Sequence, residues 1–106
     1  MDGEIYIYPS RHWHKVEVRK LNRVDLNFPQ GIKYSFTLHS PNGARILGYD
    51  NAHIVPGDKT DMPFDHVHKG TRIVRYSYQN AAQLLTDFFN DVEVILEFER
   101  EHEYEI

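Results

Sequence analysis

Cysteine is absent from this chain of 106 residues. Its absence excludes disulfides, thiolate-bound zinc sites and cysteine nucleophiles, and it agrees with a reducing compartment. Long apolar runs are also missing, so no segment is long enough to span a bilayer as a helix, and the early acidic residues Asp2 and Glu4 are untypical of a signal peptide. We therefore expect a cytoplasmic protein that does not associate with membranes.

Several common catalytic motifs are missing as well. The sequence has no glycine-rich phosphate loop, no Ser-His-Asp signature and no His-Glu-x-x-His motif, so nucleotide hydrolysis and the commonest hydrolase classes lack support. There is also no repeat, low-complexity tract or linker. A chain of this length is typical of one compact domain, which we assign to residues 1–106.

Charge is distributed unevenly behind the formal net charge of −4. Residues 1–80 carry eleven Lys/Arg and eight Asp/Glu, whereas residues 81–106 carry eight acidic residues and a single base, Arg100. Six of the seven histidines also lie in the basic portion. The acidic total therefore does not exclude RNA as a partner, because the basic portion can meet phosphate while the acidic end lies elsewhere.

Alternation of apolar and polar residues at period two predicts strands. The pattern is clearest from Ile32 to His39, and the following Ser40-Pro41-Asn42-Gly43 predicts a tight turn that returns the chain antiparallel over residues 44–49. Further strands are expected at 4–8, 14–21 and 72–78. The predicted sheet therefore lies within residues 4–78.

A helical period begins after Asn80, a residue typical of helix N-caps, and predicts one amphipathic helix over about residues 80–98. Glutamates at alternate positions from Glu97 to Glu105 place like charges at i and i+4. We therefore expect residues 99–106 to form an acidic tail that frays or adds an edge strand, which would permit a homodimer although its glutamates discourage one. The predicted fold class is α+β: an antiparallel sheet of four to six strands with one C-terminal amphipathic helix packed on one face.

The chemically richest residues flank a long connection over residues 51–63, and connections of this length are usually functional or disordered. If residues 65–70 are extended, His66 and His68 share one face. Such a pair suits metal-free RNA cleavage, in which one imidazole deprotonates the ribose 2′-OH and the other protonates the leaving 5′-oxygen. Asp50 and Asp65 are the predicted groups that orient these histidines. The predicted substrate contacts are Tyr49, Asn51, His53, Lys69, Arg72 and Arg45, with the cations stabilising the phosphorane.

The same residues also fit two different functions. His53, His66 and His68 with a carboxylate could bind a divalent metal and form a metal-dependent nuclease or hydrolase, although the predicted chemistry requires no cofactor. The chain could instead be a non-catalytic module that binds nucleic acid or protein. Each residue taken alone could be a turn cap or a solvated strand residue, but the cluster around one loop favours a site. Separately, Trp13 stands among cations and could stack on a base, although a sheet anchor is the simpler interpretation.

The order of these motifs resembles a known family. Over roughly residues 32–95 the chain is similar to the TumE family of bacterial and archaeal toxin-antitoxin toxins, through Tyr49-Asp50-Asn51-Ala52, a long proline-containing loop, Asp65-His66-Val67-His68-Lys69-Gly70, a strand and Leu84-Leu85-Thr86-Asp87-Phe88. The resemblance implies a small cytosolic toxin of a type II pair, held inactive by a cognate antitoxin that is generally a helix-turn-helix DNA-binding protein. Ribonuclease activity is our inference from the residue types and from what such toxins commonly do.

Overall fold

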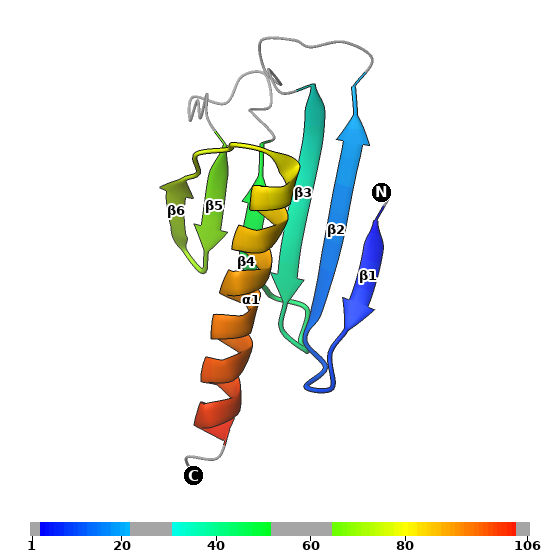
Figure 1. The fold of residues 1–106 in the computed structure, drawn as a ribbon. Helices are drawn as coiled ribbons and strands as arrows, with labels where there is room; N and C mark the ends of the chain where they lie inside the picture. The colour runs from blue at the N-terminus through cyan, green and yellow to red at the C-terminus, as the bar shows by residue number, and fades with distance from the viewer. Residues whose placement is uncertain (1–2, 22–30, 52–64, 104–106) are drawn as a thin grey trace, which may run out of the picture.

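The computed structural model describes residues 3–21, 31–51 and 65–103. Over these ranges the chain forms a six-stranded antiparallel sheet, whose strands lie in sequence order, and one C-terminal helix (Figure 1). The elements are β1 (Glu4–Ile7), β2 (Trp13–Lys20), β3 (Ile32–His39), β4 (Arg45–Asp50), β5 (His66–Lys69), β6 (Arg72–Arg75) and α1 (Ala81–Glu103). The predicted α+β class is confirmed. Within the described ranges, no helix is both long enough and apolar enough to cross a membrane.

The β3–β4 hairpin forms where the turn residues predict it. Gly43 adopts a φ of 89°, a left-handed conformation that favours glycine, and the backbone N–H of Ala44 donates to Asn42 Oδ1 at 3.0 Å. The pairing register then shifts between Leu38 and His39, so that Leu38 faces Leu47 but His39 faces Arg45. Such a bulge turns side chains from one face of a sheet to the other.

Helix α1 covers one face of the sheet and lies in front of β4, between β3 and β5, in Figure 1. Alternation along β3 places Tyr34, Phe36 and Leu38 on this face, and the ring of Phe88 on α1 lies 5.4 Å from that of Phe36. The buried core of the described residues consists of Val16, Tyr34, Phe36, Leu38, Leu47, Tyr49, Val67, Leu84, Phe88 and Val92.

The other side of the sheet, which we call the outer face, follows from the pairing register because residues opposite one another on neighbouring strands share a face. One row across the strands runs Glu17, Ser35, Asp50, His66 and Arg75, and the next runs Ile5, Lys15, Thr37, Gly48, His68 and Ile73. Arg19 pairs with Lys33 beyond the first row, and Ile7, Trp13 and His39 form the last. The outer face therefore gathers residues from every strand.

The helix is longer than the sequence predicts. Asn80 caps it as expected, since its Oδ1 accepts from the backbone N–H of Gln83 at 2.8 Å. The helix then continues to Glu103, so the prediction of a non-helical tail from residue 99 is wrong. Glu and Arg are strong helix formers, and the ion pair between Glu97 and Arg100, one turn apart, offsets part of the repulsion among the glutamates. Residues 104–106 lie outside the described ranges.

Strand β6 is shorter than expected, ending at Arg75 and not at Tyr78. The chain turns toward the helix after this point. The hydroxyl of Tyr76 donates to Asp87 Oδ2 on α1 at 2.6 Å, and the ring of Tyr78 stacks beside that of Tyr34 at 5.9 Å. These contacts direct the segment away from the sheet and into the first turns of the helix.

Candidate functional site

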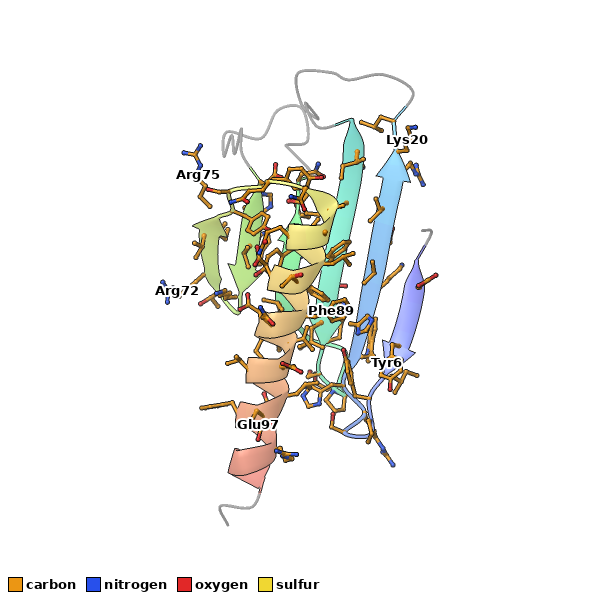
Figure 2. The ribbon with its side chains drawn as sticks, in the orientation of Figure 1. Tyr6, Lys20, Arg72, Arg75, Phe89 and Glu97 are labelled. Carbon is orange, nitrogen blue, oxygen red and sulfur yellow. The ribbon has the colours of Figure 1, made fainter. Side chains whose placement is uncertain are left out.

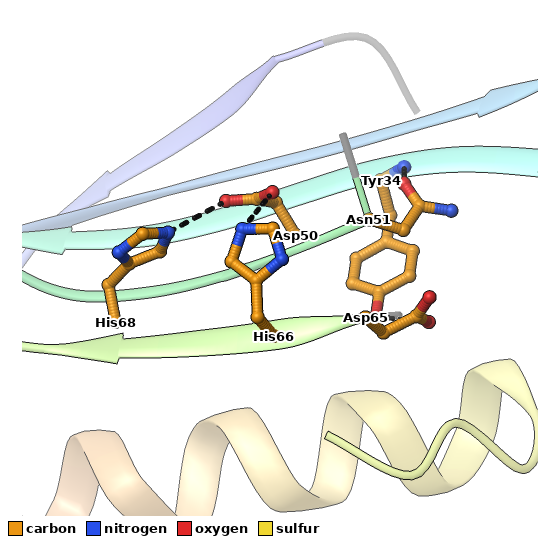
Figure 3. A network of polar contacts seen from close by, with 6 residues as sticks. All are labelled: Tyr34, Asp50, Asn51, Asp65, His66 and His68. Carbon is orange, nitrogen blue, oxygen red and sulfur yellow. Dashed lines mark hydrogen bonds and ion pairs between the residues drawn. The ribbon is translucent and has the colours of Figure 1, made fainter. Parts of the chain in front are cut away.

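Two imidazoles meet one carboxylate on the outer face. His66 Nε2 lies 2.9 Å from Asp50 Oδ1, and His68 Nε2 lies 3.7 Å from Asp50 Oδ2 (Figure 3). The two imidazole rings pack edge to face with their centroids 4.7 Å apart. The histidine side chains are 5% and 17% exposed, so the group is partly shielded from water, and its electrostatic interactions are stronger than on an open surface.

The register between β4 and β5 builds this group. Asp50 is paired with His66 and Gly48 with His68, so the histidines two residues apart on β5 point to the same side as Asp50. The intervening Val67 points to the core. The sequence-based expectation that His66 and His68 share a face, close to Asp50, is therefore confirmed by the strand geometry.

Arg45 reaches the same group across Gly48. A Cβ atom placed on Gly48 would lie 3.4 Å from Cδ of Arg45 and 3.6 Å from its Nη1, so the arginine side chain runs over the bare glycine. The bulge between Leu38 and His39 explains how Arg45 comes to this side of the sheet. The resulting group contains two imidazoles, a carboxylate and a guanidinium.

Burial and the neighbouring charges act together on the pKa of His68. Burial lowers the pKa of His68 below its usual value, the positive charges of Arg45 and His66 lower it further, and the Asp50 carboxylate opposes them. A lowered pKa leaves the His68 imidazole neutral at neutral pH. His68 can therefore accept a proton under ordinary conditions.

Asn51 and Asp65, two further predicted site residues, are buried and form hydrogen bonds at the ends of the same strands. Asn51 Oδ1 accepts from the backbone N–H of Tyr34 at 3.0 Å, and its Nδ2 donates to the carbonyl oxygen of Ile32 at 2.9 Å, which ties the end of β4 to the start of β3. Asp65 Oδ2 accepts from the hydroxyl of Tyr34 at 2.8 Å on the helix side (Figure 3). Asp65 and Asp50 thus lie on different sides of the sheet, although the sequence predicts that both orient histidines.

The remaining predicted contacts lie away from the cluster or outside the described ranges. The Tyr49 hydroxyl faces α1, where it donates to Asp91 Oδ2 at 2.5 Å, and Lys69 Nζ lies 3.6 Å from the same oxygen. Arg72 pairs with Lys69 across β5 and β6 and so shares that side. His53 lies outside the described residues.

Arg75 is a cation of the outer face that the sequence-based prediction does not include. It is paired with His66 and belongs to the same row of the outer face, whereas Arg72 lies at the other end of β6 (Figure 2). Counting positions along β6 could have found it, because residues three apart on a strand point to opposite faces. Nothing in the sequence signals the bulge that redirects Arg45.

The cluster also has the composition of a metal site. One ligand atom from each of Asp50, His66 and His68 can be chosen so that all three lie within 4.8 Å of one another. Two imidazoles and one carboxylate suit divalent ions of the first transition row. The same three side chains can therefore act either as an acid-base set or as metal ligands.

Comparison with known proteins identifies a family for the chain. The family model described as Toxin TumE matches residues 6–96, which spans both the sheet and most of the helix. No curated protein and no solved structure matches the chain. The matched range contains every member of the cluster on the outer face.

Proposed function

Because the chain belongs to the TumE toxin family, we propose that it is the toxin of a type II toxin-antitoxin pair and that it acts in the cytoplasm as a small endoribonuclease. The observation that supports this activity is the convergence of His66 and His68 on Asp50 beside Arg45. Two positioned imidazoles can move two protons in one reaction, which is what cleavage of RNA by its own 2′-OH requires. No metal is needed for these steps.

In the proposed reaction, His68 removes the proton of the ribose 2′-OH, because its lowered pKa keeps it neutral. The 2′-oxygen then attacks phosphorus, the bond from phosphorus to the 5′-oxygen breaks, and His66 donates a proton to that oxygen. His66 has the shorter contact with Asp50, whose negative charge faces it. The products are a 2′,3′-cyclic phosphate and a free 5′-OH, and the two histidines regain their starting protonation by exchange with water.

Asp50 and Arg45 have supporting roles in this reaction. The Asp50 carboxylate lies 2.9 Å from Nε2 of His66 and 3.7 Å from Nε2 of His68, and its negative charge orients both imidazoles. The Arg45 guanidinium supplies positive charge where negative charge builds up on the phosphorane. Asn51 and Asp65 act through the backbone and through Tyr34, holding the ends of β3, β4 and β5 in place.

The pH dependence of cleavage is a direct test of the His68 assignment. Because a base must be neutral, cleavage should increase with pH through the pKa of His68, and we expect this limb below about pH 6.5, the usual value for histidine. In an Arg45→Ala variant, loss of the neighbouring positive charge should move the limb toward higher pH. Rate profiles of both proteins on one oligonucleotide measure this shift, and an acid limb that does not move would contradict the assignment.

Induction of the protein without its partner tests the proposed activity in cells. We expect growth arrest together with fragmentation of cellular RNA, and the new ends should carry 2′,3′-cyclic phosphate and 5′-OH groups. Growth arrest with intact RNA would instead support a non-catalytic module that occludes its target.

A metal-dependent nuclease is a second candidate, favoured by the spacing of the ligand atoms of Asp50, His66 and His68. Metal-activated water would attack phosphorus without using the 2′-OH, so such an enzyme would also cleave a 2′-deoxy substrate. Metal analysis of untagged protein, with and without chelator, separates the two candidates. Retention of about one equivalent of metal and loss of cleavage in chelator would favour this one.

The partner we propose is a cognate antitoxin encoded beside this chain. Its contact surface would be the acidic second half of α1, where Val94 and Phe98 are 68% and 57% exposed beside Glu93 and Glu97. The apolar side chains would take part of the buried area and the glutamates would favour a basic segment of the antitoxin. Coexpression with the product of the adjacent reading frame should restore growth. Failure of any neighbouring product to do so would contradict this partner.

A further inference from the structure

Positive charge dominates the outer face, in contrast to the acidic helix on the other side of the sheet. Within the described ranges, the charged residues of this face are Lys15, Glu17, Arg19, Lys33, Arg45, Asp50 and Arg75. Lys15 already pairs with Glu17 at 3.0 Å, and Asp50 is engaged by the two histidines. Among the described residues of the outer face, five cations outnumber two carboxylates, which gives this face a net positive charge.

A preformed aromatic stack lies on the same face. The rings of Trp13 and His39 are parallel within 7°, with centroids 3.8 Å apart. The imidazole is fixed in this plane, since its Nδ1 lies 3.3 Å from the Gly43 carbonyl oxygen and its Nε2 lies 3.0 Å from Thr37 Oγ1. Both Trp13 and His39 are partly exposed. A nucleobase that stacks on this pair would lie parallel to both rings, and neither ring would have to reorient.

The stack and the cluster lie along one line of the outer face. His39 and Ser35, the residue paired with Asp50, are four positions apart on β3, which is ~13 Å at the rise of a strand. Arg45 is paired with His39 and extends over Gly48 toward His68, so its guanidinium lies between the stack and the histidines. A stacking platform, a phosphate-binding cation and the proposed catalytic pair thus follow one another.

We propose that the outer face binds single-stranded RNA, with the Trp13–His39 pair as a base-stacking subsite beside the cleaved phosphate. Single strands suit this face because an unpaired base exposes its ring to an aromatic platform, whereas bases in a duplex are already stacked on their neighbours. Arg19 and Lys33 add contacts to the phosphate backbone at the far end of β2 and β3. The proposal deepens the function proposed above, from which it takes the identity of RNA as the target.

Trp13 provides the test, because it is the only tryptophan of the chain. The full-length protein is titrated with a 2′-O-methyl RNA oligonucleotide, which cannot be cleaved through the 2′-oxygen, and tryptophan fluorescence is followed. We expect saturable quenching by the single strand and much weaker binding of a duplex of the same sequence. Tryptophan fluorescence that does not change at concentrations where a labelled oligonucleotide is bound would overturn the subsite.

Variants measured with a labelled oligonucleotide locate the surface. Trp13→Ala should weaken binding roughly 5- to 150-fold, the range expected for loss of one base stack, whereas Trp13→Phe should retain most of the affinity. Arg19→Ala with Lys33→Ala should lower the slope of log affinity against log salt by about 1.4, while Arg100→Ala, on the helix, should leave it unchanged. Equal slopes for the double variant and Arg100→Ala would overturn the proposal.

The outcome can be separated from that of the proposed function, because this binding needs no cleavage. Binding that depends on Trp13 in a protein that never cleaves RNA would support the platform and contradict the ribonuclease. Cleavage that is unaffected by Trp13→Ala would support the ribonuclease and contradict the base-stacking subsite.

Discussion

Replacing either His66 or His68 by alanine is expected to lower the rate of RNA cleavage by about 10²–10⁴-fold, the usual contribution of one positioned acid or base. Each variant leaves the reaction with one of its two proton transfers unassisted. The effects should not add in the double variant, because groups that act as a unit in one step are not independent. Single-turnover rates on a short oligonucleotide, together with growth on induction, measure this loss.

The control for these variants is a histidine outside the cluster. His14 lies on the helix side, where its Nδ1 is 2.6 Å from the hydroxyl of Tyr8 and its ring contacts that of Phe89. A His14→Ala variant therefore removes an imidazole from the packing and leaves the cluster intact. If His14→Ala reduced cleavage as strongly as His66→Ala while both proteins stayed folded, the assignment of the acid-base pair would be wrong.

Phe88→Ala is expected to lower the free energy of unfolding by about 3–5 kcal/mol, the range for a buried aromatic side chain replaced by alanine. Phe88 is fully buried at 0% exposure, and its ring meets the rings of Phe36 and Tyr49, at 5.4 and 5.8 Å. It therefore joins α1 to the two central strands. Because domains are stable by only about 5–15 kcal/mol, this single change could remove most of the stability. Urea denaturation of both proteins measures the difference in the free energy of unfolding, provided that its dependence on urea concentration, the m-value, is the same for the two.

Phe98→Ala is the matched comparison, since it is the same chemical change on the same helix at a side chain that is 57% exposed. We expect it to cost less than about 1 kcal/mol. Similar losses for the two variants would show that the helix is not held to the sheet through its buried stripe.

Local patterns account for most of what the sequence predicts correctly. The Ser40-Pro41-Asn42-Gly43 turn and the Asn80 cap depend on residues within a few positions of one another, so a single sequence contains the information. The shared face of His66 and His68 follows from the alternation of any strand. The predicted helix end at residue 98 is wrong because repulsion between like charges at i and i+4 is outweighed by the helix propensity of Glu and Arg and by the Glu97–Arg100 pair.

The predicted phosphate contacts show why the rest of the site is harder to predict from the sequence. Lys69 is next to His68 in sequence, but neighbours on a strand point to opposite faces, and Lys69 pairs with Asp91 of the helix. Arg45 reaches the cluster through a bulge and a bare glycine, which depend on the pairing register and not on local propensity. Separation of Asp50 from Asp65 likewise follows from tertiary structure, since only the fold brings Tyr34 to Asp65.

Metal-free cleavage by His66 and His68 is tested most directly by incubating purified protein with a single-stranded RNA in the presence of a chelator and identifying the new ends. We expect cleavage that persists in chelator, leaves 2′,3′-cyclic phosphate and 5′-OH ends, and is lost both in the His66→Ala, His68→Ala double variant and on a 2′-deoxy substrate. Cleavage that stops in chelator, or that is as fast in the double variant as in the unaltered protein, would contradict metal-free cleavage by these histidines.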